Sequence, residues 1–363
     1  MFSQFLLATP GQVKITKVKP NHWSAGWQSN EYAKVNIGVI ELALSPRNIT
    51  MQFTSLTETS RKIHEIMAAG VRETITECIK ELAQPSAVPN EHQHRALETL
   101  VTITKLSPQN RNLVAQSDAA ISSLVALSKT PSLPTVQTLA LSVLFNLSLN
   151  TSLKHSLAQI DTIVHLNTII LSPNSTESGK LAASLVCSLA MLHKNKAKFG
   201  VAGTVQVLVK AISGPRSPAA HHLLSSLAEL VQFHGNCTVA VRAGAVPVLL
   251  AVAESSNEED LSGTSLAILG LLARFEEGLN ELKRTDRLVA RMVGILKKGR
   301  MLSKEGACEI LLRLFDESEG CLRHAVRLPE FSSVLADVSV RGSGRAREKA
   351  GLLMKKIMDA NVY

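Results

Sequence analysis

A cluster of potential metal ligands lies in the C-terminal third of this 363-residue chain, where Cys308, Cys321 and His324 are close in sequence. Thiolates and imidazoles are zinc ligands, but zinc sites usually carry paired Cys-x₂-Cys or His-x₃₋₅-His spacings, and this cluster has neither. Cys308 also directly follows a small residue, Ala307, that we expect to be packed. Buried structural cysteine is therefore the better interpretation.

The remaining chemical candidates are equally weak. His92 and His94 fit an exposed helix face, and His221 and His222 have no ligand partner nearby in sequence. The RGSGRA stretch (341–346) contains G-x-G but lacks the third glycine of a phosphate loop. No G-x-S-x-G, Walker A, H-E-x-x-H or Cys-x-x-Cys motif occurs in the sequence. We therefore predict no catalytic, cofactor-binding or metal site, and no enzyme.

The composition predicts an all-α fold. Hydrophobic residues make up 45% of the chain but aromatic residues only 4%, so the core is mainly aliphatic, and Ala and Leu are strong helix formers. Five widely spaced cysteines suggest no disulfide framework. The N-terminus lacks a signal-peptide pattern, and no apolar run is long enough for a membrane span. We expect a soluble protein of the cytoplasm or nucleus.

The net charge of +9 does not favour nucleic-acid binding. The basic excess is mild and is interrupted by the acidic stretch 233–273, whereas nucleic-acid binders concentrate positive charge on one face. A solvated basic surface accounts for the charge, and a nucleic-acid-associated solenoid stays a secondary alternative.

A repeat of about 42 residues organises the chain. Each unit has a small residue followed seven positions later by a large aliphatic one, which places both on one helix face. These marker pairs are Ala96/Ile103, Ala140/Leu147, Ala182/Leu189, Ala220/Leu227, Ser265/Leu272, Ala307/Leu314 and Ala350/Ile357. A turn of small residues and an aliphatic helix precede most pairs, as in RAGAVPVLLAVA (242–253). The pattern of each unit therefore predicts a short helix, a second helix, and a third helix that carries the marker pair.

Stacked units of this kind bury one another's apolar faces in a continuous core. We predict an α-solenoid of about seven three-helix repeats over residues 57–360. Residues 1–56 stand apart and hold Trp23, Trp27 and Tyr32. A short strand, a disordered leader, a foreign exon and a cap on the first repeat all fit this segment.

The repeats resemble armadillo (ARM) repeats, in AGAVPVLL (243–250) and ALSVLFNLSLN (140–150). The C-terminal RGSGRAREKAGLLMKKI is similar to the last repeat of plant armadillo proteins that often carry a U-box. The resemblance implies a right-handed solenoid that binds proteins. A U-box has a Cys-Pro-Ile segment that residues 1–56 do not supply, so ligase activity is not carried over to this chain.

In the armadillo family, the third helices line a concave groove. One position before each aliphatic marker we find Thr102, Asn146, Ser188, Ser226, Leu271, Arg313 and Lys356. Import receptors of this fold have Asn here and Trp one turn earlier, but only Asn146 matches and no repeat contains Trp. Ser142, Ser184, His222, Ala267, Glu309 and Leu352 occupy the Trp positions. A receptor for basic cargo is therefore not favoured.

We predict that Asn146, Ser188, Ser226, Arg313 and Lys356 line a groove that binds a partner protein segment. Arg313 and Lys356 suggest acidic residues near the C-terminal end of that segment; the alternative is that both are simply solvated. The predicted function is a non-catalytic interaction scaffold. The alternative is the substrate-recognition portion of a ubiquitin-ligase pathway. The sequence does not indicate the partner or the oligomeric state.

Overall fold

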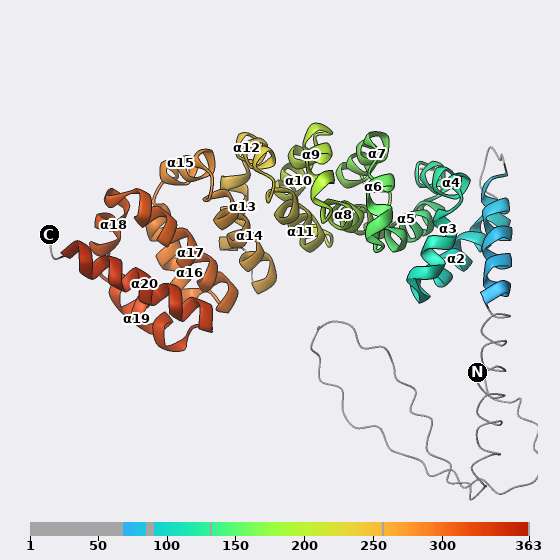
Figure 1. Cartoon of the computed structure of the whole chain (residues 1–363). Helices are drawn as coiled ribbons and strands as arrows, with labels where there is room; N and C mark the ends of the chain where they lie inside the picture. Colours follow the sequence, from blue (N-terminus) through green and yellow to red (C-terminus); the bar gives the residue numbers. More distant parts are fainter. Residues whose placement is uncertain (1–67, 85–90, 131–132, 256–257, 362–363) are drawn as a thin grey trace, which may run out of the picture. The chain divides into compact units, whose positions relative to one another are not determined.

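The computed structural model of the chain describes residues 68–84, 91–130, 133–255 and 258–361. All of them lie in one compact unit that spans residues 61–363. Every regular element in these ranges is a helix (Figure 1), which confirms the all-α prediction. The segment 1–56, its three aromatic residues, and the predicted boundary after it lie outside the described residues.

The marker pairs fall on the third helix of each repeat, as predicted. The third helices are α2 (Glu91–Leu106), α5 (Pro134–Ser148), α8 (Thr176–Ala190), α11 (Ala220–Leu230), α14 (Glu259–Leu272), α17 (Met301–Glu317) and α20 (Gly344–Asn361). Ten of the fourteen marker residues are under 1% exposed, but Ala220 and Ile357 are only partly buried. Ala220 is the first residue of α11, where the adjacent Ala219 is buried instead, and Ile357 lies near the end of the last helix.

In the last four repeats, the second helix starts directly after turn residues. The second helices are residues 68–82, α4 (Asp118–Ser128), α7 (Ile160–Leu171), α10 (Thr204–Ser213), α13 (Ala245–Ser255), α16 (Leu288–Lys298) and α19 (Phe331–Arg341). Gly203 and Gly244 precede α10 and α13 with φ of 76° and 81°, a left-handed conformation that glycine adopts without strain. Arg287 has φ of 54° before α16, so a larger residue takes the same turn there.

The first helices are short and connect one repeat to the next. They are α3 (Pro108–Ala115), the 3-10 turn η1 (Thr151–Leu153) with α6 (Lys154–Leu157), α9 (His193–Val201), α12 (His234–Arg242), α15 (Glu276–Arg284) and α18 (Glu319–Val326). Serine side chains start several helices; Ser175, for example, forms a reciprocal capping box with Ser178 before α8.

Consecutive third helices pack against each other along the chain, and the third helices from α5 to α20 also pack against the second helix of their own repeat (Figure 1). We call the exposed sides of α2, α5, α8, α11, α14, α17 and α20 together the third-helix face. Within the described residues, no single helix has the length and apolar character of a membrane span. The apolar pair α12–α13 passes that test jointly, but it bends by 78°.

Candidate partner-binding surface

Asn146 on α5 lies between two third helices. Its side chain is largely buried, with 5% of the residue exposed. The amide Nδ2 donates to Thr104 Oγ1 at 3.0 Å and to the Val101 carbonyl at 3.3 Å, both on the preceding α2. The residue that matched the peptide-clamping asparagine of the resembled receptors thus bonds to its own chain.

Ser188 and Ser226 occupy the same position on α8 and α11. Ser188 Oγ lies 2.8 Å from Ser148 Oγ and donates to the Ser148 carbonyl at 3.1 Å. Ser226 Oγ donates to the Ala183 carbonyl at 2.7 Å and is fully buried. Short polar side chains at this position therefore link consecutive third helices. Contact of Asn146, Ser188 or Ser226 with a partner remains a prediction.

Arg313 and Lys356 differ because their side chains reach the surface. Arg313 is 44% exposed and its Nε lies 3.5 Å from Glu309 Oε1, one turn away on α17. Lys356 is 36% exposed and pairs with Asp316 across α17 and α20. Both predicted cationic groups already face a carboxylate of this chain, and partner binding by them likewise remains a prediction.

The Lys356 pair belongs to a ladder of charges between α17 and α20. Arg345 Nη1 lies 3.7 Å from Glu305 Oε1, and Lys349 Nζ lies 3.1 Å from Glu309 Oε2. Burial alone raises the pKa of Glu309, but the hydrogen bonds and charges of Lys349 and Arg313 outweigh it and leave the pKa below its ordinary value. Three of the five basic side chains of the terminal helix therefore face carboxylates of the preceding repeat.

The third-helix face is hollowed between α14 and α17. This hollow of about 420 Å³ is lined by glycines, alanine and leucines and by charged residues that include Arg274, Glu305 and Lys349. Gly306 permits the close approach of the two helices, because a Cβ there would lie 2.6 Å from the Cβ of Leu266. Ala267, one of the positions that hold Trp in the resembled receptors, is exposed in the same hollow.

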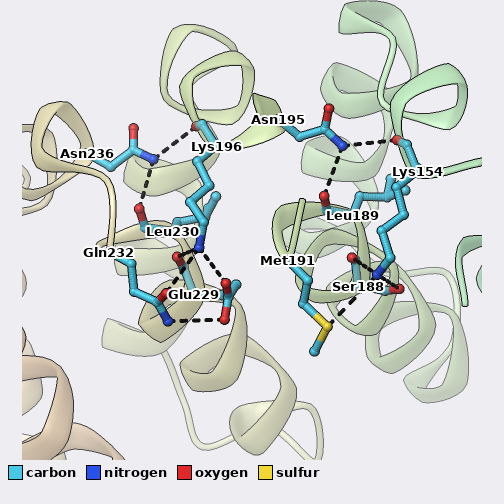
Figure 2. Close-up of polar contacts among 10 residues, drawn as sticks. All are labelled: Lys154, Ser188, Leu189, Met191, Asn195, Lys196, Glu229, Leu230, Gln232 and Asn236. Atoms are coloured by element: carbon cyan, nitrogen blue, oxygen red, sulfur yellow. Dashed lines mark hydrogen bonds and ion pairs between the residues drawn. The ribbon is translucent and has the colours of Figure 1, made fainter. Parts of the chain in front are cut away.

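A second polar feature, which the marker pattern did not predict, lies at the C-terminal ends of α8 and α11 (Figure 2). Asn195 Nδ2 donates to the carbonyls of Leu189 and Lys154, both at 3.0 Å. Asn236 Nδ2 donates to the carbonyls of Leu230 and Lys196, both at 3.0 Å. Each asparagine thus satisfies a terminal carbonyl of a third helix and bonds to the first helix of the previous repeat.

Lys154 and Lys196 also bind the C-terminal ends of these third helices through their ammonium groups. Lys196 Nζ donates to the Glu229 carbonyl at 2.7 Å and pairs with the Glu229 carboxylate, while Lys154 Nζ donates to the Ser188 carbonyl. A cation at a helix C-terminus is favourable because the last carbonyls carry partial negative charge. The sequence contained a signal for both, since each lysine follows an aliphatic marker by seven residues.

Cys308 is buried, and His221 and His222, which are adjacent in sequence, each have a side-chain partner in the fold. Burial raises the pKa of Cys308 and of Cys237 to about 12, so neither is a reactive thiolate. His222 Nδ1 lies 2.9 Å from Ser184 Oγ, and His221 Nε2 lies 3.1 Å from Glu258 Oε2. Among the described residues, no group of three or more His, Cys, Asp or Glu side chains has metal-binding geometry.

Comparisons with known proteins agree with this architecture. Residues 74–362 match the model of the plant U-box protein ARM repeat region. The chain is 27% identical over 213 residues to U-box domain-containing protein 8 of Arabidopsis thaliana, an alignment that covers 58% of this chain and 55% of that protein. The chain therefore spans about half the length of this relative.

Solved structures share the fold. An engineered protein has a TM-score of 0.66 at 17% identity, covering 79% of this chain and 72% of its own. A computationally designed armadillo repeat protein for modular peptide recognition has a TM-score of 0.58, also at 17% identity, covering 65% of this chain and 98% of its own. At this identity the likeness shows the fold alone.

Proposed function

Because the chain belongs to the plant U-box protein ARM repeat family, we propose that it is a non-catalytic scaffold whose third-helix face binds a segment of a partner protein. The observation that carries the proposal is the hollow between α14 and α17. It combines small and aliphatic lining residues with charged residues of both signs, which suits side chains of an extended segment better than a small ligand.

The architecture also fits the length of such a ligand. Packed helices lie roughly 10 Å apart, and an extended peptide of twelve residues reaches about 40 Å. A segment of that length spans several third helices, so its affinity comes from many weak contacts along the face.

The test uses a blocked hollow. Random dodecapeptides are selected on the whole chain, and their affinities are then measured for Ala267→Arg, which fills the hollow, and for Ala126→Arg on the second helix α4 as a matched control. Both alanines are exposed, so neither substitution disturbs the core. We expect Ala267→Arg to weaken binding at least about tenfold and Ala126→Arg to leave it unchanged. Equal affinities for both variants would refute the proposal.

The partner's acidic residues form the finer part of the proposal. The double variant Arg313→Glu/Lys356→Glu tests it directly: a loss of partner recovery in pull-downs supports contact at these cations, and equal recovery contradicts it. The carboxylates of Glu309 and Asp316 already pair with Arg313 and Lys356, so the acidic residues of a partner have to compete with them.

A second candidate function is substrate recognition in a ubiquitin-ligase pathway. The match of residues 74–362 to the ARM region of plant U-box proteins favours it. Ubiquitination assays on this polypeptide alone distinguish a scaffold from a ligase, because chain formation would require catalytic machinery that the scaffold proposal excludes.

A cytoplasmic or nuclear location completes the proposal, and it rests on the cysteine content. Imaging of a fluorescent fusion in plant cells tests it; exclusion from both compartments would contradict it.

A further inference from the structure

Lys154 and Lys196 hold equivalent places in consecutive repeats (Figure 2). The backbone carbonyl of each accepts a hydrogen bond from an asparagine of the following repeat, Asn195 or Asn236. Each ammonium in turn donates to a carbonyl in the last turn of a third helix. The two lysines are thus matched in backbone position, direction and capping role.

The two ammonium groups differ in what neutralises them. Lys196 pairs with the carboxylate of Glu229 and also lies 3.3 Å from Gln232 Oε1. Lys154 has instead the Ser188 hydroxyl at 3.2 Å and the Met191 sulfur at 3.9 Å. Glu229 and Met191 are equivalent residues, each two positions after its aliphatic marker, so methionine stands where the next repeat has a carboxylate.

Lys154 is therefore a buried cation without a counterion. Only 6% of the residue is exposed, and the described residues include no carboxylate within ion-pair distance of its Nζ. Buried charges are costly unless they are paired. Burial lowers the pKa of Lys154, and the nearby Cys187 and the more distant charge of Glu229 offset this only in part.

The residue that covers Lys154 can move. Met191 directly follows the end of α8, is 61% exposed, and has a flexible side chain. Its thioether is a weak acceptor, whereas a carboxylate would form a charge-assisted bond to the same ammonium. Met191 therefore covers the ammonium from the solvent side, where an incoming group can displace it.

We propose that Lys154 recognises one carboxylate of a partner segment bound along the third-helix face, and that this carboxylate displaces the Met191 thioether. The ligand takes the place that Glu229 holds beside Lys196. The inference rests on the proposed function and specifies the chemistry of its partner: an acidic side chain or a C-terminal carboxylate.

The test compares three pools of randomised dodecapeptides on the whole chain. The first has a fixed central Glu and an amidated C-terminus, the second a central Gln and an amidated C-terminus, and the third a central Gln and a free C-terminal carboxylate. Affinities of the selected peptides are measured by fluorescence anisotropy. We expect carboxylate-bearing peptides to bind about tenfold tighter than their neutral counterparts, and the pool that shows this gain identifies the source of the carboxylate.

Three variants connect that gain to Lys154. Met191→Glu places a carboxylate beside Lys154 and should abolish the gain, as should Lys154→Met, while the isosteric control Met191→Gln should keep it. Without peptide, Met191→Glu should also have a higher Tm than Met191→Gln, a readout that does not depend on folding of Lys154→Met. Equal binding of charged and neutral peptides, or an equal or lower Tm for Met191→Glu, would overturn the inference.

The blocking variant Ala267→Arg separates this inference from the proposed function. If it weakens all peptides while charged and neutral peptides bind equally, only the role of Lys154 fails. If it weakens none, the binding face itself is wrong, and the inference fails with it.

Discussion

One helix position carries short polar residues in the first half of the solenoid and long charged residues in the last two repeats, and the two halves use it differently. Asn146, Ser188 and Ser226 are buried and join consecutive third helices through hydrogen bonds. Arg313 and Lys356 extend beyond the same interface to surface ion pairs. Side-chain length thus decides whether this position stabilises the stack or faces solvent.

The difference has energetic consequences. Buried hydrogen bonds are costly to remove because their partners lose them without gaining water. Exposed ion pairs contribute little and are screened by salt. The first half of the stack should therefore depend on specific polar side chains, and the exposed ion pairs of Arg313 and Lys356 should tolerate substitution.

The largest effect is expected within the buried network, at Lys196. Lys196→Met leaves the Glu229 carboxylate without its cation and should lower the free energy of unfolding by about 2 to 3 kcal/mol, since Glu229 is mostly buried. Lys154→Met strands no carboxylate and should cost less than about 1 kcal/mol. Urea unfolding of the whole chain, with hydrogen exchange in α9 and α11 to locate the loss, measures both. Equal costs would show that the two lysines are equivalent.

Close packing between α14 and α17 should give the next largest effect. Gly306→Ala should destabilise the chain by about 1 to 2 kcal/mol through overpacking against Leu266. Gly351→Ala is the matched control, since nothing lies within 4 Å of a Cβ there, and it should stabilise α20 by about 0.5 to 1 kcal/mol. A gain in Tm for both variants would mean that α14 and α17 separate easily.

Ser226 represents the buried polar residues at this helix position. Ser226→Ala removes the bond to the Ala183 carbonyl and should cost about 1 kcal/mol. The neighbouring Ser225 is exposed, so Ser225→Ala should change the free energy of unfolding by less than about 0.5 kcal/mol. Denaturant titration of both variants measures the difference, and indistinguishable midpoints would remove the role assigned to Ser226.

Lys356 represents the charged residues that reach the surface from the same helix position. Lys356→Gln should cost at most about 0.5 kcal/mol, and the cost should vanish near 1 M salt. Lys355→Gln, an exposed neighbour on α20, serves as the control. A cost above 1 kcal/mol that persists in salt would place Lys356 in the same class as the buried residues.

The smallest expected effect is on stability in mild acid, where the first half of the solenoid should lose stability before the last repeats do. Burial lowers the pKa of His165 and His222, so the folded first half binds fewer protons than the unfolded chain and loses stability as pH falls below about 6.5. Glu309 has a lowered pKa, so its contribution is lost only as pH falls below about 4.5. Hydrogen exchange at pH 5.5 and 7.5 should therefore show reduced protection in α7 and α11 before α17. His222→Gln should weaken the effect at α11, and uniform loss across the repeats would contradict it.

The sequence by itself determined the helical class, the repeat length and the helix that carries each marker pair. These follow from local rules, because a seven-residue spacing on one helix face and a turn of small residues need no distant partner to be recognised. It also determined that Gly203 and Gly244 sit at turns, since only glycine adopts a left-handed conformation there at no cost.

Only the tertiary structure decided which polar residues are free. Asn146 and Ser226 are bonded to residues about one repeat away, and Lys356 pairs with Asp316 at a similar separation. Lys154 and Lys196 look alike in sequence, yet only the packed helix ends show that one has a carboxylate beside it and the other a methionine. Such pairings depend on how successive repeats are stacked, and the pattern within a single repeat does not contain that information.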